Sequence, residues 1–229
     1  MRRFLLYALL LFAGNAAAAM PAILVVGDSL SAGYGIALHT AWPALLQQRL
    51  EKQGYRYHVV NASISGDTTS SGRARLPAAL ARHRPQVVII ELGANDGLRG
   101  LPLTEMRANL SAMIAMALHH EARVLLVGMY LPTNYGQAYA DRFHRIYLDL
   151  SREYRVPLVP FLLQGVALEP QMMQLDGLHP RAAGEPRVLE NVWRVLKPML
   201  RGRTAPAQQT GRIIQRSAAT HEDQETRPH

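Results

Sequence analysis

The stretch Ile23-Leu24-Val25-Val26-Gly27-Asp28-Ser29-Leu30 joins an apolar run to an abrupt polar turn. A short, continuous apolar run that ends at a turn is typical of a strand buried on both faces of a parallel sheet. Gly27, and Gly33 and Gly35 a little further on, permit positive φ angles and close backbone approach. Taken alone, the turn is explained by Asp28 or Ser29 capping a following helix. The rest of the chain decides whether Ser29 does more.

Predicted strands and helices alternate outward from this turn. The strands are predicted at 23–26, 57–60, 87–92, 124–129 and 158–161, and the helices at 41–53, 70–82 (with a possible kink at Pro77), 103–120, 137–154 and 184–200. This alternation predicts a parallel α/β sheet with helices on both faces. Right-handed crossovers favour a flavodoxin-like strand order, 2-1-3-4-5. The ligand crevice of such a sheet lies beyond the carboxyl ends of its strands, where Ser29, Gly66 and Asn95 follow strands 1, 2 and 3.

The composition limits the classes of protein. The chain has 229 residues, 48% of them hydrophobic, as expected for one globular domain. It has no cysteine, which excludes disulfides, thiol nucleophiles and cysteine-ligated metals. The net charge of +8 comes without a basic run or an aromatic stripe, so nucleic-acid binding is not favoured. Modest attraction to anionic lipid headgroups or acidic substrates fits the charge better.

The two ends of the chain differ from its centre. Residues 1–19 carry Arg2 and Arg3, then a short apolar run, then the small residues Ala17-Ala18-Ala19. This order predicts a signal peptide cleaved near Ala19, since the run is too short to span a bilayer. We therefore expect a periplasmic or secreted enzyme domain at 20–200, without stable membrane insertion after processing. Residues 201–229 are polar and without periodicity, and we predict a disordered tail.

A serine, an aspartate and a histidine are the candidates for nucleophilic catalysis. A serine hydroxyl is a weak nucleophile unless a base takes its proton and a third group orients that base. Asp176 and His179 can supply such a pair for Ser29 from one short loop bounded by Gly177 and Pro180. Acyl transfer also needs donors for the developing oxyanion, and the backbone N–H groups of Ser29 and Gly66 are two candidates. The side-chain amide of Asn95 is the third, and we expect Asp28 and Asp96 to fix their loops.

Four blocks together carry a resemblance to a known family. They read Gly27-Asp28-Ser29-Leu30, Gly66, Gly93-Ala94-Asn95-Asp96 and Asp176-Gly177-Leu178-His179. In this order and at these separations they resemble the SGNH, or GDSL, hydrolases, over about residues 22–200. Further matches at 41–46, 60–67, 91–100, 134–136 and 156–161 resemble its periplasmic branch of multifunctional thioesterase, protease and lysophospholipase enzymes.

The resemblance implies a three-layer α/β/α hydrolase that uses no metal or cofactor. Ser29 would be the nucleophile, His179 the general base and Asp176 its orienting partner, with the oxyanion hole formed by Ser29, Gly66 and Asn95. The substrates would be aryl and alkyl esters, acyl thioesters and lysophospholipids. Residues 97–101 would form a mobile loop over the acyl chain and residues 129–135 another wall. The substrate-binding residues implied on these segments are Leu98, Arg99, Tyr130, Leu131 and Asn134.

Two departures from the family pattern bear on the site. Ala94 stands where relatives have a second glycine, which would add a methyl group near the oxyanion site. Gly184-Glu185 replaces the usual Ala-Gln, which bears on contacts at the start of the last helix.

Our leading hypothesis is a monomeric serine esterase of broad acyl specificity. The alternative within the same chemistry is a carbohydrate O-acetylesterase, which would prefer acetyl to octanoyl esters. A lipid-binding or sugar-binding module without catalysis is a third possibility, because a fold does not fix a function.

Overall fold

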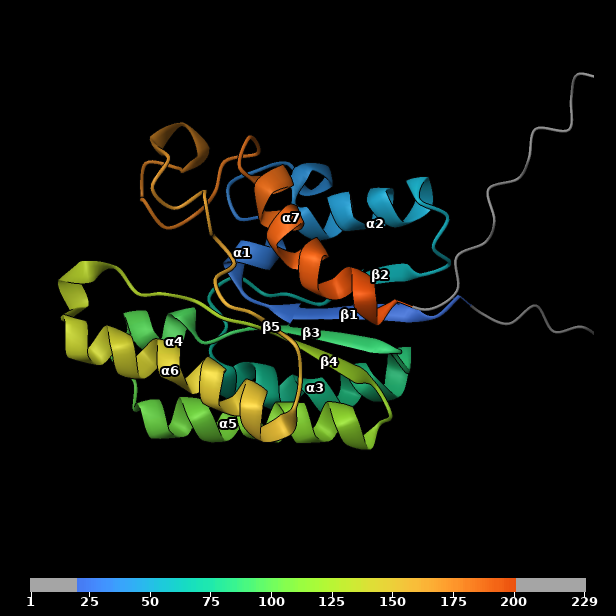
Figure 1. Cartoon of the computed structure of the whole chain (residues 1–229), viewed down its shortest axis with the longest axis horizontal. Coiled ribbons are helices and arrows are strands. Elements are labelled where there is room, and N and C mark those ends of the chain that lie inside the picture. Colours follow the sequence, from blue (N-terminus) through green and yellow to red (C-terminus); the bar gives the residue numbers. More distant parts are fainter. Residues whose placement is uncertain (1–19, 201–229) are drawn as a thin grey trace, which may run out of the picture.

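The computed structural model describes residues 20–200. The predicted signal peptide at 1–19 and the predicted tail at 201–229 lie outside the described residues. Within 20–200, the chain forms a central sheet covered by helices on both faces (Figure 1). The predicted fold class is therefore confirmed.

The sheet has five parallel strands in the order β2-β1-β3-β4-β5. Their bounds are β1 Ala22–Gly27, β2 His58–Asn61, β3 Val87–Glu91, β4 Arg123–Val127 and β5 Leu158–Val159. This is the predicted 2-1-3-4-5 order. The apolar runs of β1 and β3 are buried along their whole length because helices cover both faces of these central strands.

The helices form the two outer layers. The longer ones are α2 Trp42–Lys52, α3 Thr69–His83, α5 Leu103–His119, α6 Gln137–Tyr154 and α7 Glu185–Leu196. Helices α2 and α7 cover one face of the sheet, and α3, α5 and α6 cover the other (Figure 1). Pro77 lies inside α3, which continues as one helix on both sides of it. The last predicted helix ends at Leu196, and a 3-10 turn, η4 Lys197–Met199, follows.

Two short helices lie where the sequence predicted turns. They are α1 Ser29–Ala32 and α4 Ala94–Leu98, which follow β1 and β3. Each has about one turn, too short for a helical pattern of apolar residues to be recognised. Three 3-10 turns, η1 Leu38–Thr40, η2 Thr133–Tyr135 and η3 Pro170–Met172, complete the connections. Since all five strands are parallel, the segments after them gather at one edge of the sheet, beside α1 and α4 (Figure 1).

Candidate active site

Ser29 lies at the point where β1 turns into α1. Asp28 is the N-cap of α1, and its carboxylate accepts the Leu30 backbone N–H at 3.0 Å. The helix ends at Gly33, whose φ of 76° is in the left-handed region that glycine favours. The capping interpretation of this turn is correct for Asp28. It leaves the Ser29 hydroxyl free to face the cavity described below.

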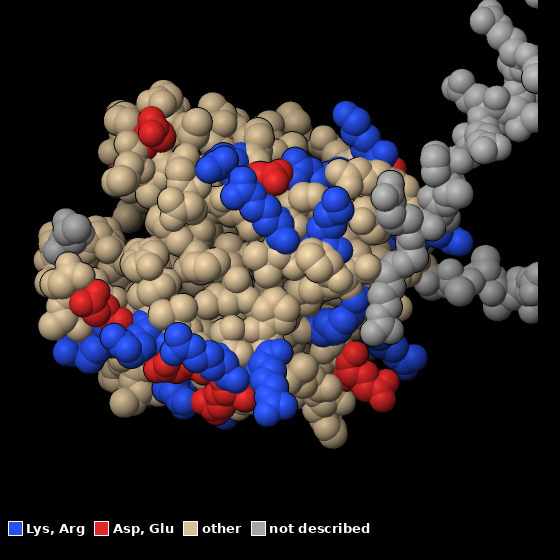
Figure 2. Space-filling model, in the orientation of Figure 1, with Lys and Arg blue, Asp and Glu red and all other residues tan. Residues whose placement is uncertain are grey.

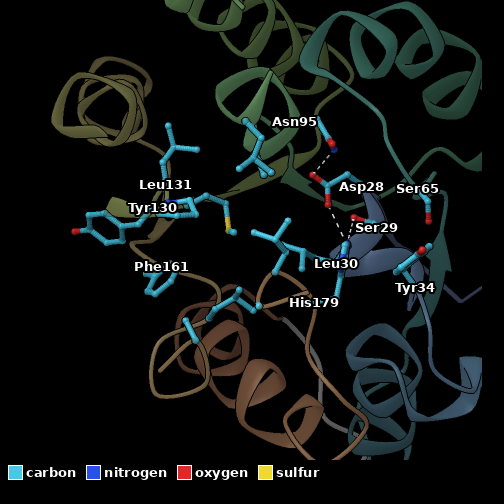
Figure 3. A pocket seen from close by; sticks show the side chains of 18 of the residues that line it. Asp28, Ser29, Leu30, Tyr34, Ser65, Asn95, Tyr130, Leu131, Phe161 and His179 are labelled. Carbon is cyan, nitrogen blue, oxygen red and sulfur yellow. Dashed lines mark hydrogen bonds between the residues drawn. The ribbon is translucent and has the colours of Figure 1, made fainter. Parts of the chain in front are cut away.

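His179 links Ser29 to Asp176. The Ser29 Oγ lies 2.8 Å from His179 Nε2 (Figure 3). On the other side of the ring, His179 Nδ1 lies 2.7 Å from Asp176 Oδ2. The ring of Tyr34 packs against the imidazole with its centroid 4.7 Å away. An imidazole held in this way can take a proton from the serine hydroxyl and return it to a leaving group.

The loop around Asp176 keeps its carboxylate ionised. Asp176 Oδ1 accepts the backbone N–H groups of Leu178 at 2.9 Å and His179 at 3.1 Å. Partial burial raises the pKa of Asp176, but these donors and the imidazole outweigh that effect and hold the pKa below its usual value. An ionised Asp176 can fix the tautomer of His179 with the proton on Nδ1.

Gly66 and Asn95 reach the same cavity from the segments after β2 and β3. Gly66 has a φ of 84°, a conformation that side chains rarely adopt. Asn95 lies in the first turn of α4, and its amide nitrogen donates to Asp28 Oδ2 at 3.2 Å (Figure 3). The same nitrogen also donates to the Asp67 carbonyl at 2.9 Å. Both amide hydrogens therefore have acceptors within the protein. An arriving substrate oxygen would have to replace one of them.

Two buried carboxyl groups lie under the Ser29 turn. The pKa of Asp28 is raised to about 6, because burial, together with nearby Asp67, outweighs the lowering effects of Leu30, His179 and Asn95. Glu91, at the end of β3, is fully buried, and burial together with Asp28 raises its pKa well above the usual value. Glu91 Oε2 accepts the Ser31 hydroxyl at 2.6 Å. A Cβ at Gly27 would lie 2.6 Å from the same oxygen, so glycine is required there.

A cavity of about 610 Å³ extends from Ser29 and His179. In Figure 3, Tyr130, Leu131 and Phe161 lie at its other end. Its walls are mostly apolar and come from the segments after all five strands. An apolar cavity with a few polar groups at one end suits a ligand with a long apolar part and one reactive group.

The structure brings three of the five predicted substrate-binding residues to this cavity. Leu98, Tyr130 and Leu131 line it, whereas Arg99 and Asn134 do not. Arg99 instead donates to the Gly66 carbonyl at 2.9 Å. Asn134 is exposed because η2 turns it outward. The structure therefore does not bring these two residues to the wall of this cavity, and their part in substrate binding stays a prediction.

Four apolar wall residues were missed by the sequence analysis. They are Phe161, Leu163, Ala167 and Leu168, all from the segment after β5. The run Phe161-Leu162-Leu163 begins two residues after β5, whose carboxyl end faces the site. An apolar run at the carboxyl end of a parallel strand was therefore the sequence signal that could have identified these wall residues.

The two departures from the family pattern have definite places. Ala94 lines the cavity beside Asn95, so its methyl group does lie at the site. Glu185 begins α7 and is buried, and its carboxylate accepts the Trp42 backbone N–H at 2.7 Å. Glu185 thereby joins the starts of α2 and α7, and burial raises its pKa to about 7.

Asp96 and Thr69 connect two helices beside the site. The carboxylate of Asp96 accepts the Thr69 backbone N–H at 2.9 Å and the Thr69 hydroxyl at 2.5 Å. Asp96 therefore fixes its loop, as predicted. Within residues 20–200, no cluster of three or more His, Asp or Glu side chains is placed to hold a metal ion. None of the helices in that range is long and apolar enough to cross a membrane.

Comparisons with known proteins identify the family of this chain. The sequence pattern of the GDSL-like lipase/acylhydrolase family matches residues 25–186. Esterase TesA of Pseudomonas aeruginosa is 52% identical over 183 residues, which cover 80% of this chain and 91% of that protein. Thioesterase 1/protease 1/lysophospholipase L1 of Escherichia coli K12 is 44% identical over 184 residues, covering 80% and 87%. A crystal structure of TesA superposes with a TM-score of 0.77 at 52% identity, covering 78% of this chain and 99% of that one.

Proposed function

Because this chain belongs to the GDSL-like lipase/acylhydrolase family and is an esterase and thioesterase, we propose that it cleaves acyl esters through a covalent acyl-Ser29 intermediate. One observation carries the proposal: a Ser29-His179-Asp176 chain of hydrogen bonds opens into an apolar cavity. A carbohydrate O-acetylesterase is not favoured by the relatives.

In the first half of the reaction, Ser29 Oγ attacks the acyl carbon while His179 Nε2 takes its proton. Asp176 holds the imidazole and stabilises the imidazolium that forms. His179 then gives the proton to the leaving alkoxide or thiolate, and the bond to the leaving group breaks. The products of this half are a free alcohol or thiol and acyl-Ser29.

In the second half, water attacks the acyl carbon and His179 takes the proton of that water. The tetrahedral intermediate collapses, the proton returns to Ser29 Oγ, and the fatty acid leaves. In both halves the oxyanion is bound by the N–H groups of Ser29 and Gly66 and by the amide of Asn95. The substrate oxygen replaces Asp28 or Asp67 as an acceptor of the Asn95 amide. These two internal hydrogen bonds hold the amide in position before substrate binds, as an oxyanion donor requires.

The acyl chain lies in the cavity along Leu98, Tyr130 and Leu131. Their apolar surfaces contribute binding free energy in proportion to the area that they bury. Ala94 narrows the entrance near the oxyanion hole. Residues 97–101 close over the chain.

The expected location follows from the predicted termini. Residues 1–19 direct export, and the domain acts in the periplasm or outside the cell on small-molecule acyl substrates. It works as a monomer, without a cofactor and without nucleic acid. Residues 201–229 take no part in this mechanism.

The test is the hydrolysis rate of p-nitrophenyl esters from acetyl to palmitoyl. Ser29→Ala should lose at least about 10⁴-fold in kcat, because a triad without its nucleophile retains only oxyanion and binding effects. The matched control is Ser111→Ala, since the Ser111 hydroxyl is bonded to Tyr154 away from the cavity. A maximum at medium or long chains is expected. A maximum at acetyl would contradict the proposed substrate class, and turnover by Ser29→Ala near the natural rate would contradict the mechanism.

A further inference from the structure

Large apolar side chains are exposed around the mouth of the cavity. Leu175 is 99% exposed and Leu168 is 93% exposed. Tyr34, Ile64, Tyr130 and Leu178 are each at least about a third exposed. We call these six residues the apolar rim.

The rim is one surface because of the fold. Tyr34 follows β1, Ile64 follows β2, Tyr130 follows β4, and the three leucines follow β5. Tyr34, Tyr130, Leu168 and Leu178 also line the cavity while exposed to solvent, which places them at its mouth. Leu175 lines a shallow depression together with Tyr34, and Ile64 precedes the cavity residues Ser65 and Gly66.

The distribution of charge sets this surface apart. On the face that Figure 2 shows, the protruding part of the chain between β5 and α7 is mostly uncharged apart from one acidic patch, whereas charges crowd the outer faces of the helices. The charged residues of this segment are Glu169, Asp176 and Arg181. Single exposed leucines are common on soluble proteins and need no explanation. Several of them at the mouth of a reactive cavity indicate an interaction site.

We propose that the apolar rim docks on a lipid surface, so that an acyl chain passes from the lipid layer into the cavity without crossing water. This inference rests on the proposed function, because the cavity must receive an acyl chain. Side chains that project singly from separate loops can each insert into a fluid layer. They do not need a partner of matching shape.

Arginines beside the rim match the charge of such a surface. Arg181 is exposed and lines the same depression as Leu175. Arg99 is exposed and lies over Gly66, its guanidinium bonded only to a neutral carbonyl among the interactions of the described residues. Two carboxylates lie in the segment between β5 and α7: Asp176 is bonded to His179, and Glu169, next to Leu168, accepts a hydrogen bond from Gln171. Arg181 and Arg99 can meet anionic headgroups, while the leucines meet acyl chains.

The experiment measures sedimentation of the full chain with vesicles of phosphatidylcholine alone or mixed with phosphatidylglycerol. Every variant carries Ser29→Ala, which removes turnover of the lipid. All variants also have the same termini, so any contribution of residues 1–19 to vesicle binding is the same in each. Adding Leu175→Ser should weaken binding to both kinds of vesicle by about tenfold, and adding Ile64→Ser should weaken it further. Arg181→Gln should weaken binding by about fivefold, and only to the anionic vesicles.

The matched control is Leu118→Ser. Leu118 is 39% exposed near the end of α5, which leads into the start of β4 at the opposite edge of the sheet. It should leave vesicle binding unchanged. Without Ser29→Ala, Leu175→Ser and Ile64→Ser should hydrolyse soluble p-nitrophenyl acetate within about twofold of the natural rate, since neither residue lines the cavity. They should slow the hydrolysis of lysophospholipid held in vesicles.

Two results would overturn the proposal. One is that Leu175→Ser weakens vesicle binding no more than the control Leu118→Ser does. The other is a dimer in light scattering that Leu175→Ser abolishes, which would assign the rim to a second copy of the chain. Turnover by Ser29→Ala would contradict the catalytic mechanism instead, and it would leave the binding measurement intact.

Discussion

Two aspartates of the site lie in very different surroundings: Asp28 precedes Ser29 in the chain, and Asp176 is bonded to His179. Asp28 is 1% exposed, while the side chain of Asp176 is 37% exposed. Burial raises the pKa of Asp28 to about 6. The pKa of Asp176 is lower than usual because two backbone N–H groups and His179 outweigh the effect of its partial burial.

The comparison shows that hydrogen-bond donors and burial decide the charge of a carboxyl group near this site. Asp176 receives three donors within one short loop and stays ionised over the whole physiological range. Asp28 receives donors from Leu30 and Asn95, but desolvation exceeds their effect. Asp176 is therefore suited to orient His179, and Asp28 to hold the turn and the amide of Asn95.

Among the residues around the Ser29–His179 pair, the largest effect is expected for Asp176→Asn. Asparagine keeps the shape but removes the charge that fixes the tautomer of His179, so kcat on an aryl ester should fall by about 10³–10⁴-fold. The matched control is Asp141→Asn, because Asp141 is exposed on α6 and bonded to Gln137. A loss below about tenfold would mean that Asp176 does not have the role that its hydrogen bonds suggest.

Asn95→Ala should have the next largest effect. It removes an oxyanion donor and one of the donors to Asp28, and kcat should fall by about 10²–10³-fold with little change in KM. Steady-state kinetics on a soluble aryl ester measure both constants. Asn109→Ala is the control, since the amide of Asn109 contacts Thr69 and Arg73 outside the cavity. Equal kinetics for Asn95→Ala and the natural chain would exclude Asn95 from the oxyanion hole.

Asp28→Asn should have the smallest effect on rate, less than about tenfold, since asparagine is also a good N-cap. Its clearer effect is on stability. The folded pKa of Asp28 is above the unfolded value, so the natural chain loses stability as pH rises from about 4 to about 6. The variant lacks this loss, which amounts to about 3 kcal/mol at most.

Urea denaturation across that pH range measures the difference between the two chains. Asp176→Asn should change the pH dependence in the opposite sense. A lowered pKa stabilises the fold above the usual value of the carboxyl group, and this contribution is lost as pH falls through the lowered pKa. Parallel pH profiles for the natural chain and Asp28→Asn would show that Asp28 is not desolvated as described.

Much of the fold could be predicted from the sequence because its signals are local. The apolar runs of β1 and β3 and the periodicity of the long helices are properties of adjacent residues. The short helices α1 and α4 were missed because one turn carries no periodicity. The N-cap of α4 depends on a tertiary contact, because a Cβ at Gly93 would clash with the Tyr147 hydroxyl.

The candidate site was predictable in its polar groups and less so in its walls. Ser29, Asp176 and His179 were found from residue type and order, and the structure places them within hydrogen-bond distance. Leu163 and Leu168 were not found, because an apolar residue in a loop looks the same whether it lines a cavity or packs in the core. Arg99 and Asn134 were predicted at the cavity wall from their positions in the sequence alone. In the structure neither residue lines the cavity, and Arg99 is bonded to the Gly66 carbonyl.

The sequence by itself determined the parallel α/β class, the strand order and the reactive groups. Periodicity, turn residues and motif blocks are properties of residues close together in the chain. Only the tertiary structure decided the protonation of Asp28, the shape of the acyl cavity and the apolar rim. Each of these depends on residues far apart in the chain: Asn95 reaches Asp28 across 67 positions, and His179 reaches Ser29 across 150. Desolvation and packing depend on all the atoms that surround a group, and folding alone brings those atoms together.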